Sequence, residues 1–308
     1  MNPHATADNA DDDPGCFASD GEIDCLVELD LRGGDGIDGR DGNLIFSPRP
    51  ANGADGRRGE DASPATAGRR AAAATLELTY PNQKSDSGAI AISGIAVASD
   101  GSSHPIDVTR VIGEQGYVFI RAVGGKGGNG GRGGNGQPGA PGSPGRDATR
   151  FSNGTDGGPG GDGGDAGNPS DGQPGGDGGD ITLQIDHQHL GLLMLVTGDL
   201  SGGDIGFAGE RGLGGQGGPG GPGGSSYHWT TTHRTGGKNG QTHTVHHSNP
   251  GGSTGRSGRD GAPSSYRAHD GNPGKNGRLR ILVNGPDGVR TQYESPYYRE
   301  RVPYLRTG

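Results

Sequence analysis

The sequence is poor in the residues from which proteins build apolar cores. Hydrophobic residues make up 27 % and aromatic residues 5 % of the 308 residues. Leu, Ile, Val and Phe together fall below the roughly 20 % at which ordinary globular folding becomes doubtful. No apolar run approaches the roughly 18 residues that cross a membrane. We therefore expect neither a Rossmann fold nor a TIM barrel, and no membrane insertion.

The sequence also has few basic residues relative to acidic ones, no hydrophobic stretch at its start and few cysteines. The net charge is −9, whereas nucleic-acid binding uses a basic face, so we expect no nucleic-acid partner. The first 14 residues hold no hydrophobic stretch of the signal-peptide kind, which makes a cytoplasmic location the default expectation. The two cysteines, Cys16 and Cys25, leave a short disulfide or two free thiols open.

Glycine is the residue that is present in excess, and it is periodic. Gly accounts for 70 of 308 residues. It recurs at every third position from Gly124 to Gly145 and again from Gly203 to Gly224, with shorter series elsewhere. In several series a second glycine follows the first, which gives Gly-Gly-x triplets. A flexible linker has no reason to keep such a register.

Period three is the repeat of the left-handed polyproline-II helix, which has no internal hydrogen bonds. A collagen triple helix is disfavoured because the runs are short and proline numbers only 21. A bundle of short antiparallel polyglycine-II helices explains the register better. In such a bundle the two glycine faces contact neighbouring backbones, and the third position carries its side chain to solvent.

Short segments with alternating apolar residues separate the glycine series and predict strands. They are found at 27–31, 76–80, 90–97, 118–120, 181–185 and 279–283.

The predicted fold class is therefore mostly β and irregular, with polyglycine-II helices projecting from a small β-sheet base and almost no α-helix. We divide the chain into a disordered acidic N-terminus (1–20), a strand region with short glycine-triplet loops (21–116), a polyglycine-II bundle with its β-base (117–284) and a C-terminal connection to a further domain (285–308). A hairpin, 226–248, is inserted in the bundle.

This layout resembles the glycine-rich N-terminal domain of Obg-type GTPases, in which polyglycine-II helices project from a β-base. The segment Gly-Gly-Asp-Gly-Gly-Asp-Ile-Thr-Leu-Gln-Ile at 175–185 is similar to the point where such a helix re-enters a strand. The resemblance covers 117–284. No GxxxxGK[ST] motif is present, so GTPase activity is not implied.

The chain also resembles the N-terminal region of large uncharacterised collagen-like proteins of microbes and fungi. The similar segments are 146–168, Leu193–Val196 and 220–229. This resemblance covers most of the chain and implies no activity. It implies further domains of the same polypeptide.

The hairpin 226–248 is the candidate binding surface. It interrupts the glycine series and holds the single Trp, and two β-prone stretches flank its Gly-rich turn. We expect Tyr227 and Trp229 to share one face of a strand because side chains alternate. The candidate binding residues are Tyr227, His228, Trp229, His233, His243, His246 and His247.

Three interpretations of the hairpin remain open: a solvated Thr/His ribbon, a contact surface for protein or glycan, and a metal site. The sequence contains no HExxH, and the hairpin holds no Cys or carboxylate. We expect no metal and no cofactor, and assign no catalytic residue.

The predicted function is a non-enzymatic structural or interaction module that presents loops within a larger protein. The alternative is a surface or receptor-binding adhesin-like module. Ice binding and a metal-dependent enzyme are weaker alternatives.

Overall fold

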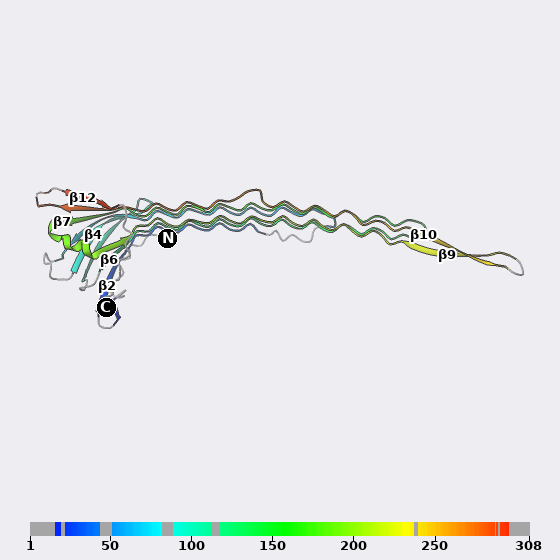
Figure 1. The fold of residues 1–308 in the computed structure, drawn as a ribbon, viewed down its shortest axis with the longest axis horizontal. Helices are drawn as coiled ribbons and strands as arrows, with labels where there is room; N and C mark the ends of the chain where they lie inside the picture. The colour runs from blue at the N-terminus through cyan, green and yellow to red at the C-terminus, as the bar shows by residue number, and fades with distance from the viewer. Residues whose placement is uncertain are drawn as a thin grey trace.

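The molecule is elongated, with β-sheets at one end, a long bundle of extended segments, and a two-stranded ribbon at the other end (Figure 1). The computed structural model describes residues 16–19, 22–43, 51–81, 89–111, 117–236, 240–286, 288 and 290–295, with side chains between 27 and 294. Most of the predicted N-terminal segment 1–20 and C-terminal connection 285–308 lies outside the described residues.

Among the described residues the regular secondary structure is almost entirely β-strand, arranged in three sheets, with one short helix, the 3-10 helix η2 (His187–Leu195). One sheet has the order β1 (Cys16–Ser19), β2 (Glu22–Asp30), β6 (Tyr117–Arg121), β8 (Val196–Asp199). Another has the order β12 (Arg290–Ser295), β11 (Leu279–Asn284), β7 (Ile181–Asp186), β3 (Ala73–Thr79), β4 (Ala89–Val97), β5 (Ser103–Val111). The third is the ribbon of β9 (Tyr227–Arg234) and β10 (Thr242–Asn249).

The apolar core lies in the base. The alternating segments that predicted strands form β2, β3, β4, β6, β7 and β11, so this prediction is confirmed. Their inward residues are almost fully buried, with Leu76 and Ile181 at 0 % exposure and Leu192 of η2 at 1 %. The sequence did not predict β5, because only Ile106 of this edge strand is buried. Pro105 fits there because an edge strand has one row of N–H groups without a partner strand.

Six extended runs form the long bundle, which we call the rod. Within each run, backbone N–H groups donate to neighbouring runs at intervals of three residues. The runs alternate in direction, since odd-numbered runs leave the base and even-numbered runs return (Figure 1). They are run 1 (31–43), run 2 (51–72), run 3 (122–148), run 4 (153–180), run 5 (200–226) and run 6 (250–278). Runs 1 and 2 come from the part of the chain that the sequence assigned to the strand region 21–116.

The rod has two layers, and each layer continues one sheet of the base. Runs 1, 3 and 5 follow β2, β6 and β8, which are parallel neighbours in that order. Runs 2, 4 and 6 lead into β3, β7 and β11, which are likewise parallel neighbours. The backbone bonds between parallel runs keep the same partners, as in Gly124 N–H to Ser201 O (2.9 Å) just beyond the Arg121↔Asp199 pair. The polypeptide therefore passes from sheet to rod without changing its neighbours.

Each N–H of a Gly-Gly-x triplet in run 3 has its own acceptor. Gly124 donates to run 5, and Gly125 donates to Arg69 O of run 2 at 2.9 Å. The third N–H, of Lys126, donates to the Asp35 carboxylate of run 1 at 2.8 Å. The sequence predicted that side chains at the third position point to solvent. Many of them are exposed, yet their Asp and Asn oxygens also accept backbone N–H groups from the next parallel run.

This side-chain ladder recurs along both layers. In the layer of runs 1, 3 and 5, Asp38 accepts from Asn129 and Asn129 accepts in turn from Phe207. In the other layer, Asp61 accepts from Asn168 at 2.6 Å and Asp165 accepts from Ala262 at 2.7 Å. Further links of the same kind are Asp41–Arg132, Asp55–Asp162, Asn135–Leu213, Asp156–Ser253, Asp162–Arg259, Asp177–Lys275 and Asp180–Arg278.

Run 6 carries one extra residue, which changes its register against run 4. Ala166 donates to Ala262 O, whereas Gly172 donates to His269 O, so six steps of run 4 face seven of run 6. The intervening Ser264 is buried and its hydroxyl donates to Asn168 Oδ1 at 2.8 Å. Tyr266 donates its hydroxyl to Asp171 at 2.8 Å. We call the extra residue and its surroundings, 264–266, the bulge. The hydrogen bonds of Ser264 and Tyr266 to run 4 hold it in place.

A Cβ on a packed glycine has no room, which gives a first prediction. At Gly215 it would lie 2.2 Å from Gln137 O, whereas at Gly34 the nearest atom is Arg69 Cδ at 3.9 Å. We expect Gly215→Ala to lower the free energy of unfolding by roughly 1–3 kcal/mol, because displaced runs leave backbone groups unpaired. Gly34→Ala, the matched control, should change it by less than about 0.5 kcal/mol. Chemical denaturation measures both; equal losses would contradict the packing.

A second prediction concerns acid. The pKa of Asp171 is lowered first by the backbone N–H of His269 and then by the Tyr266 hydroxyl, and that of Asp61 by the N–H of Asn168 and by Arg58. A carboxylate with a lowered folded pKa stabilises the protein above its unfolded pKa, and this contribution is lost as the pH falls through the folded value. Thermal stability should therefore decline below about pH 4.

The acid-induced decline should be smaller in Asp171→Asn, which keeps an acceptor oxygen but does not titrate. Asp204→Asn is the matched control, because in the described structure Asp204 accepts no such bond. Thermal melts between neutral and acidic pH measure the difference. If Asp171→Asn loses as much thermal stability in acid as the wild type, ionisation of the Asp171 carboxylate does not contribute to the decline.

Candidate functional site

The candidate surface predicted at 226–248 forms the ribbon β9–β10, at the far end of the rod (Figure 1). The ribbon continues runs 5 and 6 in one register: Gly252 N–H donates to Gly224 O at 2.8 Å, and Asn249↔Tyr227 is the first strand pair beyond it. The glycine series ends at Gly224, and beyond it Thr and His residues, among them Thr230–Thr232, take the place of the glycine triplets. β-branched residues favour a strand, so the same pair of segments becomes a β-ribbon.

The strand register sorts the candidate residues onto two faces. Directly opposite residues are Trp229↔His247 and His233↔His243. Since side chains alternate, the aromatic face consists of Tyr227, Trp229, Thr231, His233, His243, Val245, His247 and Asn249. The threonine face consists of His228, Thr230, Thr232, Arg234, Thr242, Thr244, His246 and Ser248. Five of the seven candidate residues thus share one face, and His228 and His246 lie on the other.

The aromatic residues stack on one another. The rings of Trp229 and His247 are stacked with centroids 5.1 Å apart and planes 14° apart. Tyr227 lies 5.7 Å from Trp229 on the same strand, with planes tilted by 32°. His247 Nε2 lies 2.8 Å from Thr231 Oγ1. The indole of Trp229 therefore contacts two neighbouring rings, one on its own strand and one on the opposite strand, and this cluster lies at the root of the ribbon.

The remaining imidazoles are exposed and spread out. His228 Nε2 lies 3.1 Å from Ser226 Oγ, and His233 faces His243 across the ribbon. Across the part of the chain that the structure describes, no group of three or more His, Cys, Asp or Glu is arranged to hold a metal ion. What the ribbon offers is hydroxyl and imidazole hydrogen bonding on both faces.

Phe151, in the turn between runs 3 and 4, is not among the site residues predicted from the sequence. Its side chain is 92 % exposed. The turn contacts the root of the ribbon, because Asn249 Nδ2 donates to Thr149 O at 2.7 Å. The available signal was a lone aromatic residue between two glycine series.

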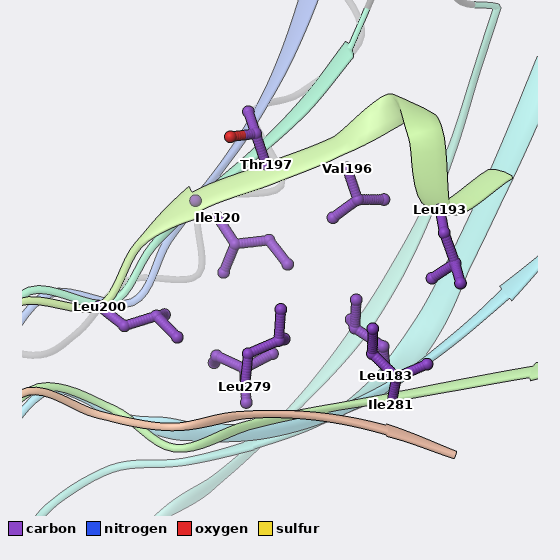
Figure 2. Close-up of a pocket in the computed structure, with 10 residues that line it drawn as sticks. Ile120, Leu183, Leu193, Val196, Thr197, Leu200, Leu279 and Ile281 are labelled. Atoms are coloured by element: carbon purple, nitrogen blue, oxygen red, sulfur yellow. The ribbon is translucent and has the colours of Figure 1, made fainter. Parts of the chain in front are cut away.

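Two hollows lie at the base. A cavity of about 40 Å³ between the two sheets is lined by apolar residues of β6, β7, β8, β11 and η2, among them Ile120, Leu183 and Ile281 (Figure 2). Leu193 and Val196 point into it (Figure 2). It is small and almost entirely apolar, with Thr197 as its one lining residue that has a polar side chain.

The second hollow is a polar cleft of about 730 Å³ where the rod meets the base. Its walls come from runs 1, 2, 3 and 5 and from the turn after β4, so no local motif announces it. Arg32 and Arg70 are paired with Asp30 and Asp180 at 2.6 and 3.1 Å. Arg69 and Lys126 also line the cleft, together with Asp35, Asp100 and Asp204. Four basic and four acidic residues line the cleft, so their formal charges balance.

Because the chain has a single Trp, its fluorescence reports on the ribbon root. His247→Ala removes the stacked ring, and we expect a red-shifted Trp229 emission and faster quenching by a soluble quencher. His246→Ala, the neighbouring residue on the threonine face, should leave the emission unchanged. Neither variant should shift the unfolding midpoint of the rod. Identical spectra for the two variants would show that the stack does not shield Trp229.

Comparison with protein-family models, with curated proteins and with solved structures finds no match to this chain.

Proposed function

We propose that the protein is a rigid, non-enzymatic scaffold whose six runs are polyglycine-II helices and whose distal ribbon contacts a partner. One observation carries the proposal: backbone hydrogen bonds of 2.7–3.0 Å join the runs at every third residue along both layers. A period of three without bonds inside the segment is the pattern of this helix type. The arrangement on a β-base also agrees with the resemblance to the glycine-rich domain of Obg-type GTPases.

Rigidity follows from the number of neighbours. Run 3 exchanges backbone bonds with runs 1, 2, 4 and 5, and run 4 does so with runs 2, 3, 5 and 6. Bending the rod would break bonds in several runs at once. A stiff support holds the ribbon in one orientation, which reduces the ordering cost when a partner binds.

The assignment as a non-enzyme rests on the chemistry of the hollows. The 40 Å³ cavity is lined by apolar side chains and the Thr197 residue, with no titratable group. In the cleft the Asp30 and Asp100 carboxylates are held by Arg32 and Ser102. The ribbon, by contrast, places exposed polar and aromatic groups at the end of a long support. No helix among the described residues is long and apolar enough to span a membrane.

The proposed partner is a protein or a glycan that contacts the ribbon, and further domains of the same polypeptide would follow the rod. An adhesin-like module is the second candidate function, and the position of the ribbon at the tip favours it. Because the His247 ring stacks on the indole and the Tyr227 ring lies beside it, part of the Trp229 surface on which a sugar would stack already contacts protein. This favours a protein partner over a glycan.

The test replaces 227–249 by a short Gly-Ser turn. The rod should keep its unfolding midpoint, and small-angle scattering should show a shorter particle, by about 26 Å for eight strand residues. Glycan-array signals and cross-links to a protein partner should disappear in the same variant. Loss of cooperative unfolding would show that the ribbon is part of the folded core instead. A compact scattering profile for the full chain would refute the rigid rod.

A further inference from the structure

The ribbon has two strand edges with no neighbour. It is a two-stranded sheet in the described structure, and every residue of β9 pairs only with β10. Thr235 N–H donates to Gln241 O at 3.1 Å, which marks this pair as hydrogen-bonded. Because such pairs alternate along antiparallel strands, the backbone groups of His228, Thr230 and Thr232 point away from β10. They form a row of donors and acceptors along the outer edge of β9.

This edge lacks the features by which sheets avoid pairing with other chains. Strand edges are commonly protected by Pro, by charged residues or by bulges. The six-stranded sheet has such protection, since β5 contains Pro105 and β12 contains Arg290 and Glu294. In β9 the only charged residue is Arg234, and the register with β10 runs through eight pairs without a bulge. Consecutive Thr230, Thr231 and Thr232 favour an extended strand.

We propose that β9 pairs in antiparallel fashion with β9 of a second copy, so that two rods join tip to tip through a four-stranded sheet. The inference rests on the proposed function, because it identifies the partner of the ribbon. An isolated two-stranded sheet is marginally stable in water, and three or more strands are needed for independent stability. A second copy supplies the missing strands with the same edge geometry.

The two-fold axis passes through Thr231. Thr230 then lies opposite the partner's Thr232, and both residues have outward-facing backbone groups. Arg234 lies opposite the partner's His228, so two arginines do not face each other. Antiparallel pairing directs the two rods away from each other, which separates the charge of −9 on each copy. The edge of β10 is less accessible, because Asn249 is bound to the turn at Thr149 and Ser152.

The first test is mass and shape in solution. Light scattering should show a concentration-dependent dimer, and small-angle scattering should show that its longest dimension is nearly twice that of the monomer. Thr232→Pro removes an outward N–H without touching the bonds to β10, and should weaken association at least tenfold. Thr232→Val keeps the N–H and should associate like the wild type. Unchanged Trp229 emission in Thr232→Pro verifies that the ribbon remains folded.

A cross-link tests the register. With Cys16 and Cys25 replaced by Ser, Thr231→Cys places two thiols opposite each other across the two-fold axis, within reach of a disulfide. Copper–phenanthroline in air, as oxidant, should form the covalent dimer rapidly. Thr244→Cys, on β10, should cross-link much more slowly.

Three results would overturn the proposal: a monomer at every concentration up to about 1 mM, a dimer no longer than the monomer, or equal association of Thr232→Pro and Thr232→Val. None of these results would affect the rigid-rod proposal, which rests on the scattering of the monomer and on replacement of the ribbon.

Discussion

Direct contact between backbones at glycine is the constraint on which the rod depends. A Cβ on Gly125 would lie 2.0 Å from Gly34 O, and one on Gly176 would lie 2.0 Å from Arg69 O. At that spacing the N–H of a packed glycine reaches a carbonyl of a neighbouring run, so hydrogen bonds between runs replace an apolar core. Where another residue replaces a packed glycine, it is alanine, the residue with the smallest side chain, as in the buried Ala140 and Ala166. The apolar residues are then needed only in the base, where sheets meet.

The side-chain ladder explains where polar residues and prolines stand along the runs. An Asp or Asn is useful where the next parallel run has an N–H to donate, as at Asn135 and Leu213. Further along the same two runs the corresponding residues are Pro141, whose side chain has no acceptor, and Pro219, which has no backbone N–H. The ladder ends at run 6, where Arg259, Lys275 and Arg278 receive carboxylates on their N–H groups but carry cationic side chains. Cations accept no hydrogen bonds, so at these three positions run 6 offers no side-chain acceptor to a further parallel run.

Local patterns predicted much of this fold because they report local geometry. Alternation of Leu76 and Leu78 revealed β3, and the shared position of Tyr227 and Trp229 on one face is confirmed by their ring contact. The pairing of runs could not be predicted, because every run carries the same triplet and the hydrogen-bonded partners lie between 9 and 107 residues apart. The stacking of His247 on Trp229 depends on the ribbon register, which the period of the strands does not specify. The polar cleft where the rod meets the base is lined by segments that are distant in the sequence, and it could not be inferred from any of them alone.

The bulge in run 6 shows how such an architecture can change its length. One added residue displaces the whole register beyond it, and the chain absorbs the change by burying Ser264 and tying Tyr266 to Asp171. A single insertion in a run with several neighbours would misalign all of them. Growth of the rod is therefore quantised: whole triplets, each about 9 Å long, must be added to adjoining runs together. Insertions and deletions in such a chain would then have to occur in several runs together. The distance between the base and the ribbon could take only values that differ by whole triplets.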